Sequence, residues 1–293
     1  MSLVALASAK GSPGVTTLAQ LLALALAAPK GRQDTQCAAR PVLLVESDPA
    51  GGDIAARLGL PGTPGLATLA LRARRSLAPA DVLSHCQTIA GAVHVLVGVA
   101  GREQSAALEP VLGRVIEALV GLPHVVVLDA GRIDVSSSLS LELLGSAQTL
   151  AVVTRATTDA LLHARSACES LRSRGLVPEL VLVGRGRHHP RDVAQAVGAA
   201  VLGTIVDAPR EAAVSYDGLP DPKCALSRSA QALAGVIRSR GDDALAAPPE
   251  SLASSIPAAA RPSRRRLANA IRWPEAVTRS TTRRPSASPV ALP

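Results

Sequence analysis

Aromatic residues are almost absent from this sequence of 293 residues. They make up 1% of it, with one Trp, one Tyr and no Phe, whereas hydrophobic residues as a whole make up 47%. The core must therefore be built from Val, Leu, Ile and Ala, which suits a parallel sheet buried by helices on both faces. The length is sufficient for one large α/β domain with an appendage.

Cysteine is also scarce, and no two cysteines are spaced as C-x-x-C. The four cysteines are Cys37, Cys86, Cys168 and Cys224. A disulfide framework or a zinc site is not expected from this spacing, and a reducing cytoplasm is the expected compartment. The adjacent His188 and His189 have no cluster of further ligand residues beside them, so we expect a surface loop there.

Long apolar runs are lacking as well. No stretch of about 20 apolar residues is present that could cross a bilayer. The first apolar stretch, residues 3–6, is soon interrupted by Lys10, so we do not expect it to be a signal peptide. The sequence therefore predicts a cytoplasmic protein.

The positive charge is unevenly distributed. The formal net charge is +8, and residues 241–293 hold eight Arg against four acidic residues, which is half of that excess. This stretch is rich in Ala, Pro, Ser and Arg and would bury too little apolar surface to order itself. We therefore expect a domain over residues 1–240, followed by a disordered basic tail over 241–293.

One part of the tail, residues 263–273, has a pattern that is also compatible with binding to a partner. A helix there would bring Leu267, Ala270 and Ile271 to one side, near Trp273 and surrounded by Arg. Basic residues with a Trp suit an anionic membrane surface. A simple disordered tail is the first interpretation; peripheral membrane association, protein docking and nucleic-acid binding are the alternatives.

Short apolar runs alternate with helical patterns along residues 1–240. Strands are predicted at residues 3–8, 42–46, 93–98, 124–129, 150–154, 179–184 and 201–206. Helices are predicted at residues 16–28, 54–58, 103–120, 136–145, 158–174, 190–197 and 224–238. This alternation predicts an α/β fold with a doubly wound, mostly parallel sheet and helices on both faces. Ligands of such folds bind at the carboxyl ends of the strands.

A loop of small residues lies between the first strand and an Ala/Leu-rich helix, at residues 7–17. In this context backbone N–H groups and the positive end of the helix dipole can hold a phosphate. The usual phosphate loop reads G-x-x-x-x-G-K-[ST]. Here Val15 stands where that lysine is expected, between Gly14 and Thr16, and Lys10 stands near the start of the loop.

Acidic residues follow two of the later strands. Glu46 and Asp48 come at the end of the second strand, and Asp129 ends the apolar run 125–128. A buried carboxylate is costly unless it is paired, and orientation of water or of hydrated magnesium would supply a reason for these acids. An acid at the end of an apolar strand has the form of a Walker B motif, which holds magnesium.

The loop resembles the deviant Walker A loop of the MinD/ParA family, K-G-G-x-G-K-[ST], and the resemblance extends over about residues 1–240. It implies a P-loop NTPase fold that binds ATP and Mg²⁺. The implied nucleotide-binding residues are Lys10, Gly11, Ser12, Pro13, Gly14, Val15, Thr16 and Thr17.

The resemblance also implies roles for single residues. Lys10 would act catalytically across a nucleotide-dependent homodimer, on the nucleotide of the partner. Asp48 would position the attacking water, with Glu46 replacing another aspartate of the family pattern. Thr16, Asp48 and Asp129 would hold the metal.

Two departures from the family pattern leave the function open. Val15 replaces the loop lysine, and the segment 181–187 lacks the Asn that relatives carry near the purine, where only Arg185 offers itself. One hypothesis is a weak ATPase or nucleotide-dependent dimerisation switch for intracellular positioning or partitioning, with an unidentified protein partner. The alternative is a non-catalytic scaffold or localisation protein, similar to MinD-like proteins of actinobacteria, some of which are associated with pilus or secretion machinery.

Overall fold

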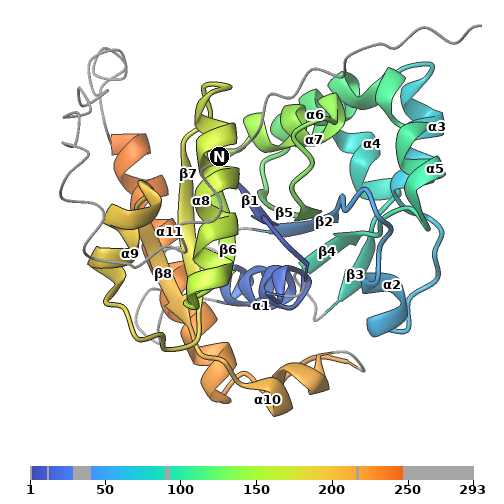
Figure 1. The fold of residues 1–293 in the computed structure, drawn as a ribbon. Helices are drawn as coiled ribbons and strands as arrows, with labels where there is room; N and C mark the ends of the chain where they lie inside the picture. The colour runs from blue at the N-terminus through green and yellow to red at the C-terminus, as the bar shows by residue number, and fades with distance from the viewer. Residues whose placement is uncertain (1, 12, 29–40, 90–92, 216–217, 247–293) are drawn as a thin grey trace, which may run out of the picture.

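The computed structural model describes residues 2–11, 13–28, 41–89, 93–215 and 218–246, and its centre is one eight-stranded sheet (Figure 1). The strands are β1 (Ser2–Ser8), β2 (Val42–Glu46), β3 (Gln87–Ile89), β4 (Val93–Leu96), β5 (Val125–Arg132), β6 (Thr149–Arg155), β7 (Pro178–Val183) and β8 (Val201–Ile205). Their order across the sheet is β3-β4-β2-β5-β1-β6-β7-β8. All neighbouring pairs are parallel except β3 and β4.

The helices cover both faces of this sheet, so the predicted doubly wound α/β fold is confirmed (Figure 1). They are α1 (Val15–Ala27), α2 (Ile54–Arg57), α3 (Leu66–Ala73), α4 (Pro79–Ser84), α5 (Arg102–Ala106), the 3₁₀ helix η1 (Glu109–Val111), α6 (Leu112–Val120), α7 (Ser138–Gly145), α8 (Thr158–Arg172), α9 (Pro190–Val197), α10 (Pro209–Val214) and α11 (Ala225–Ala246). Helices α1 and α11 pack together on one face, and α3, α6, α7, α8 and α9 lie on the other.

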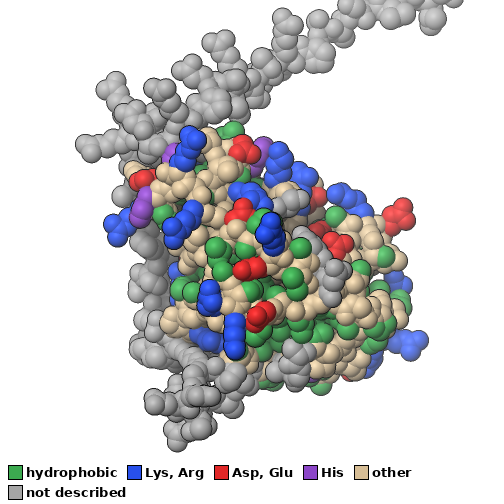
Figure 2. Space-filling view, turned by 90° about the horizontal axis from the view of Figure 1, so that it is seen from below, with side chains coloured by type: hydrophobic (Ala, Val, Ile, Leu, Met, Phe, Trp, Pro, Cys, Tyr) green, Lys and Arg blue, Asp and Glu red, His purple; other side chains and the backbone are tan. Residues whose placement is uncertain are grey.

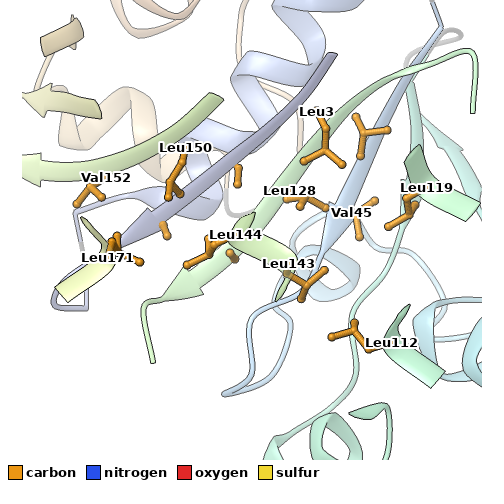
Figure 3. Packing of buried hydrophobic residues seen from close by; sticks show 14 of the residues in the cluster. Leu3, Val45, Leu112, Leu119, Leu128, Leu143, Leu144, Leu150, Val152 and Leu171 are labelled. Carbon is orange, nitrogen blue, oxygen red and sulfur yellow. The ribbon is translucent and has the colours of Figure 1, made fainter. Parts of the chain in front are cut away.

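The core is aliphatic on both faces, as the near absence of aromatic residues predicts. Leu3, Val45 and Leu128 come from the adjacent strands β1, β2 and β5 and face the same layer of helices (Figure 3). Leu119 of α6 and Leu144 of α7 belong to the same cluster and are at most 1% exposed. Because every central strand is covered on both faces, its residues need no polar alternation, which explains their continuous apolar runs.

Several elements were not predicted from the sequence. Strand β3, helix α3 and helix α4 lie between residues 58 and 93, where no strand or helix was assigned. The single helix predicted over 103–120 is instead divided into α5, η1 and α6 around Pro110, which lacks the N–H that a helix interior requires. Helix α11 continues to Ala246, beyond the domain end predicted at residue 240, and residues 247–293 of the tail lie outside the described residues.

Outside the cavity described below, few features of the described residues suggest a second site. Cys86, Cys168 and Cys224 are free thiols, and His189 accepts a hydrogen bond from the N–H of Arg191 at the start of α9. An apolar hollow of about 470 Å³ lies between α1 and residues 219–222, and the described residues lining it carry no charge. Seen from below, hydrophobic side chains gather on part of one face, with charged ones around them (Figure 2). No helix within the described ranges combines the length and apolarity needed to cross a bilayer.

A buried histidine predicts how stability depends on pH. His124, which directly precedes β5, is 7% exposed, and its Nδ1 finds no hydrogen-bond partner among the described residues. Burial, and next the ring of His94 at 5.7 Å, lower the pKa of His124 below its ordinary value. Its contribution to stability is therefore complete above pH 6.5 and is lost as pH falls toward the lowered pKa.

We expect His124→Leu to remove this loss. Urea unfolding at pH 7.5 and pH 5.5 should show a smaller fall in the free energy of unfolding for the variant than for the unmodified chain. The exposed His163 supplies the matched control, and His163→Leu should leave the fall unchanged. Equal falls for all three proteins would contradict the assignment.

Candidate functional site

The loop between β1 and α1 has the backbone conformation of an anion-binding turn. Gly14 caps α1 with φ 88°, a left-handed conformation that favours glycine, and its carbonyl accepts the N–H of Leu18 at 2.9 Å. The first N–H groups of α1 have no partner within the helix. A Cβ built on Gly11 or Gly14 would meet no protein atom within 4 Å, so the space beside the loop is open. Ser12 lies outside the described residues.

Directly behind this loop lies a buried acid. Asp129 on β5 is 0% exposed and is in register with Leu6 of β1 and Glu46 of β2. Its carboxylate accepts hydrogen bonds from the hydroxyl of Thr16 and, at 3.2 Å, from the N–H of Gly131. The second oxygen, Oδ2, has no hydrogen-bond partner among the described residues.

The environment makes the charged form of Asp129 costly. Burial, with smaller contributions from the Glu46 and Asp48 carboxylates, raises the pKa of Asp129 to about 7, although the hydrogen bonds from Thr16 and Gly131 oppose the rise. A buried carboxyl group with one unpartnered oxygen is stabilised either by protonation or by a nearby cation. This is the most informative electrostatic feature of the site.

Asp48 completes the acidic group from the neighbouring strand. It follows β2, is half-buried, and accepts the N–H of Ala50 at 2.8 Å. A Cβ on Gly131 would lie only 1.9 Å from Asp48 Oδ2, so residue 131 must be glycine to admit this carboxylate. Burial is the main cause that raises the pKa of Asp48. The structure therefore brings together Thr16, Asp48 and Asp129, the three residues that the sequence predicts as metal ligands.

Glu46 does not have the role that the sequence suggested. Its Oε1 accepts the N–H groups of Asp53 and Ile54 at 2.6 and 2.8 Å, and its Oε2 accepts the N–H of Gly98 at 2.9 Å. With 2% of its surface exposed, Glu46 does not line the cavity. The interpretation that water or hydrated magnesium explains this carboxylate is wrong, because backbone donors explain it. Glu46 instead fixes the start of α2 and the end of β4.

Val15, at the position of the usual loop lysine, and Lys10, near the start of the loop, lie in different surroundings. Val15, the first residue of α1, is 6% exposed and packs in the core, although part of it lines the cavity. Lys10 is exposed and does not line the cavity; its charge acts on Asp159, at the start of α8. Within one chain, therefore, neither position brings a cation to the open space beside the loop.

A cavity of about 510 Å³ extends from the loop to the carboxyl ends of β7 and β8. Gly11, Pro13, Gly14, Val15, Thr16, Thr17 and Asp48 line its loop end. Val183, Ile205, Pro209 and Leu226 give the other end an apolar lining, beside an ion pair of 2.7 Å between Arg155 and Asp207. Arg185, the residue offered for base recognition, is exposed and does not line this cavity.

Sequence reasoning missed three arginines that line the cavity: Arg57, Arg132 and Arg155. Arg132 is the last residue of β5 and Arg155 the last residue of β6. Both therefore lie at the carboxyl edge of the sheet, where ligands of this fold bind, and their position along the chain was a usable signal. Arg57 offered no such signal, because its short helix reaches the site only through tertiary packing.

The oxygen atoms of Thr16, Asp48 and Asp129 suit Mg²⁺ that is bound together with phosphates, and they do not suit a metal ion held by protein ligands alone. Mg²⁺ prefers oxygen ligands and is usually held by one or two carboxylates together with substrate phosphates. Thr16, Asp48 and Asp129 supply such oxygens, and the unpartnered Oδ2 of Asp129 lacks the charge that a cation provides. The described residues contain no group of three or more His, Cys, Asp or Glu side chains arranged to hold a metal by themselves.

The pKa of Asp129 predicts a stabilising substitution. Between pH 4 and pH 7 this carboxyl is charged in the unfolded chain and protonated in the folded one, so it destabilises the fold increasingly as pH rises and remains destabilising above pH 7. The difference between the two pKa values corresponds to about 4 kcal/mol at most. In EDTA at pH 8, Asp129→Asn should therefore be more stable than the unmodified chain.

Urea unfolding as a function of pH checks this expectation. The advantage of Asp129→Asn should shrink as pH falls and vanish near pH 4. The exposed Asp192 of α9 provides the control, since Asp192→Asn should show no gain that disappears in this way. A variant that is less stable than the unmodified chain at pH 8 would show that Asp129 is not strained by its charge.

Comparisons with known proteins place the fold. No protein-family model matches this sequence, and no curated protein matches it. Among solved structures, it resembles a ParA family ATPase from Chlorobium tepidum TLS, with a TM-score of 0.67, 20% identity, and coverage of 80% of this chain and 97% of that one.

Two MinD structures are similar in the same way. MinD from Pyrococcus horikoshii OT3, complexed with Mg-ADP, has a TM-score of 0.65 at 20% identity and covers 82% of this chain and 97% of its own. The cell division ATPase MinD of Pyrococcus furiosus has a TM-score of 0.63 at 22% identity, with coverage of 82% and 99%. The chain thus has the P-loop NTPase fold of the ParA and MinD ATPases.

Proposed function

We propose that this protein binds ATP together with Mg²⁺ and acts as a nucleotide-dependent dimerisation switch with weak ATPase activity, used in intracellular positioning or partitioning. The observation that carries the proposal is the unpartnered oxygen of buried Asp129 behind Thr16, at the loop end of the cavity. A cation held with phosphates beside Thr16 would supply the missing charge. Mg-ADP in the similar MinD of Pyrococcus horikoshii supports the choice of ligand.

Each part of the site has a role in this proposal. The N–H groups of the loop and of the first turn of α1 hold the phosphates, and Gly11 and Gly14 leave the space for them. Thr16, Asp48 and Asp129 hold Mg²⁺, which neutralises phosphate charge when it is bound. Asp48, fixed by the N–H of Ala50, is the carboxylate placed to orient a water molecule.

The opposite end of the cavity suits the base. Val183, Ile205 and Leu226 offer apolar surface on which a purine can pack, and Pro209 begins α10 beside them. Asp207, in its ion pair with Arg155, also lines this part of the cavity. The absence of an Asn in the loop 181–187 is therefore compatible with nucleotide binding, since packing can hold a base without it.

The burial of Val15 favours a second candidate function. A valine packed in the core cannot contact the β- and γ-phosphates as a loop lysine does. The alternative is a scaffold or localisation protein that binds nucleotide without hydrolysing it, in a pilus or secretion system for example. Turnover separates the two candidates, because both predict binding and only the first predicts release of phosphate.

Calorimetric titration with ATP–Mg tests the binding step. We expect a Kd in the micromolar range or weaker, because one charge-assisted contact, about 1.5–3 kcal/mol, is absent at Val15. Nanomolar affinity would contradict this expectation, and no binding at millimolar ATP would exclude the proposal. Asp48→Asn should still bind ATP, more weakly because one charged metal ligand is lost, and should lose phosphate release, whereas the surface variant Asp192→Asn should retain both.

A second expectation concerns Lys10. Because its exposed side chain lies outside the cavity of its own chain, Lys10→Ala should leave ATP affinity of the monomer unchanged and weaken ATP-dependent dimerisation. Light scattering after size-exclusion chromatography, with ATP and without it, measures the change. Lys223 is also exposed, and Lys223→Ala is the matched control. If ATP dimerises the Lys10→Ala variant as well as the unmodified chain, Lys10 has no role between subunits.

A further inference from the structure

The cavity needs a cation that the loop does not provide. A nucleoside triphosphate carries more negative charge than one Mg²⁺ neutralises, and Asp48 and Asp53 add negative charge to the lining. Val15 is apolar and Lys10 lies outside the cavity. The cationic side chains that line the cavity, among the described residues, are three arginines: Arg57, Arg132 and Arg155.

Arg57 is the arginine that lies against the anion-binding end of α1. Its Nη1 donates a hydrogen bond to Thr17 Oγ1 at 3.2 Å, and Thr17 is the third residue of that helix. Only 13% of the Arg57 side chain is exposed, so its guanidinium is held in place and partly shielded from water. Its Nη2 also lies 3.7 Å from the carboxylate of Asp53, whose side chain is 74% exposed, so this one pair is weak.

The other two arginines are placed less well for the phosphates. Arg155 is already committed to Asp207, with a distance of 2.7 Å, at the end of the cavity near the apolar lining. Arg132 is exposed, at the last position of β5 opposite Ser8, where water screens its charge. Arg57 combines low exposure with direct attachment to the first turn of α1.

Glu46 sets the position of Arg57 by holding the start of α2. The carboxylate of Glu46 accepts the N–H groups of Asp53 and Ile54, the two residues that start α2, and Ile54 is fully buried. A Cβ on Gly52 would lie 2.2 Å from Glu46 Oε2, so glycine there allows the chain to approach the carboxylate closely. Helix α2 is thereby fixed with Arg57 directed at Thr17.

We propose that Arg57 supplies a phosphate-contacting cation that compensates in part for the lysine that the loop lacks at Val15, with Glu46 acting as its positioning residue. This inference rests on the proposed nucleotide binding. A guanidinium can donate two parallel hydrogen bonds to phosphate oxygens, which suits this task better than a point charge does. In this proposal the phosphate-contacting cation comes from the helix after β2 and not from the loop.

Calorimetry on the full-length chain tests the inference with three ligands: ATP–Mg, AMP and adenosine. Arg57→Gln keeps a donor for Thr17 and loses the charge. We expect it to weaken ATP–Mg binding about 10- to 100-fold, the loss typical of one charge-assisted phosphate contact, to weaken AMP less, and to leave adenosine unchanged. A purely structural role of Arg57 would instead weaken all three ligands alike and would overturn the inference.

Rescue and matched controls complete the experiment. Val15→Lys should restore most of the ATP–Mg affinity lost in Arg57→Gln and should add less to the unmodified chain. Arg165 forms a comparable i,i+4 ion pair with Glu169 at 2.9 Å on α8, remote from the cavity, so Arg165→Gln should bind as the unmodified chain does. Arg132→Gln should lose less ATP–Mg affinity than Arg57→Gln; the opposite order would overturn the inference.

The outcomes separate this inference from the proposed function. If the unmodified chain binds no ATP–Mg, both fail. If it binds ATP–Mg and the folded Arg57→Gln variant binds equally well, only the role of Arg57 fails. Circular dichroism and thermal unfolding without nucleotide establish that each variant is folded. Arg57→Lys, which keeps the charge, serves if Arg57→Gln does not fold, and it should lose less than 10-fold.

Discussion

The burial of one carboxylate, that of Asp129, constrains most of the site. A charge that is removed from water must be offset by donors or by a cation, and among the described residues the donors are a hydroxyl from Thr16 and an N–H from Gly131. This acid therefore connects the loop after β1 with the middle of the sheet. Its burial also explains why the pKa of Asp129 is raised to about 7.

Glu46, the last residue of β2, and Asp48, which follows it, contact different parts of the molecule. Glu46 faces the backbone and holds the start of α2, whereas Asp48 lies over Gly131 and lines the cavity. Because their carboxylates point to different partners, their equal charge does not imply equal function. Glu46 also supports the helix that carries Arg57, the arginine proposed to contact phosphate where the loop has Val15.

Much of the fold follows from local features of the sequence. The central strands are continuous apolar runs, and the first crossover begins at a glycine whose φ of 88° few other residues adopt. These signals need no distant partner, so the strand over residues 42–46 was predicted correctly. Thr16, Asp48 and Asp129, which the sequence predicts as metal ligands, lie close together in the structure. Strand β3 has three residues and pairs at the edge of the sheet, and helices α3 and α4 are short; local preference is too weak to indicate such elements.

The sequence by itself determined the α/β class, the phosphate-type loop, the aliphatic core and the acids at the strand ends, because each depends on residue type and spacing along a few adjacent positions. Only the tertiary structure decided which of the acids lines the cavity and which arginines line it. Glu46 and Arg57 obtain their roles from atoms far from them in sequence, at Gly98 and Thr17. Hydrogen bonding over such separations depends on how the sheet and helices pack, and no local pattern records it.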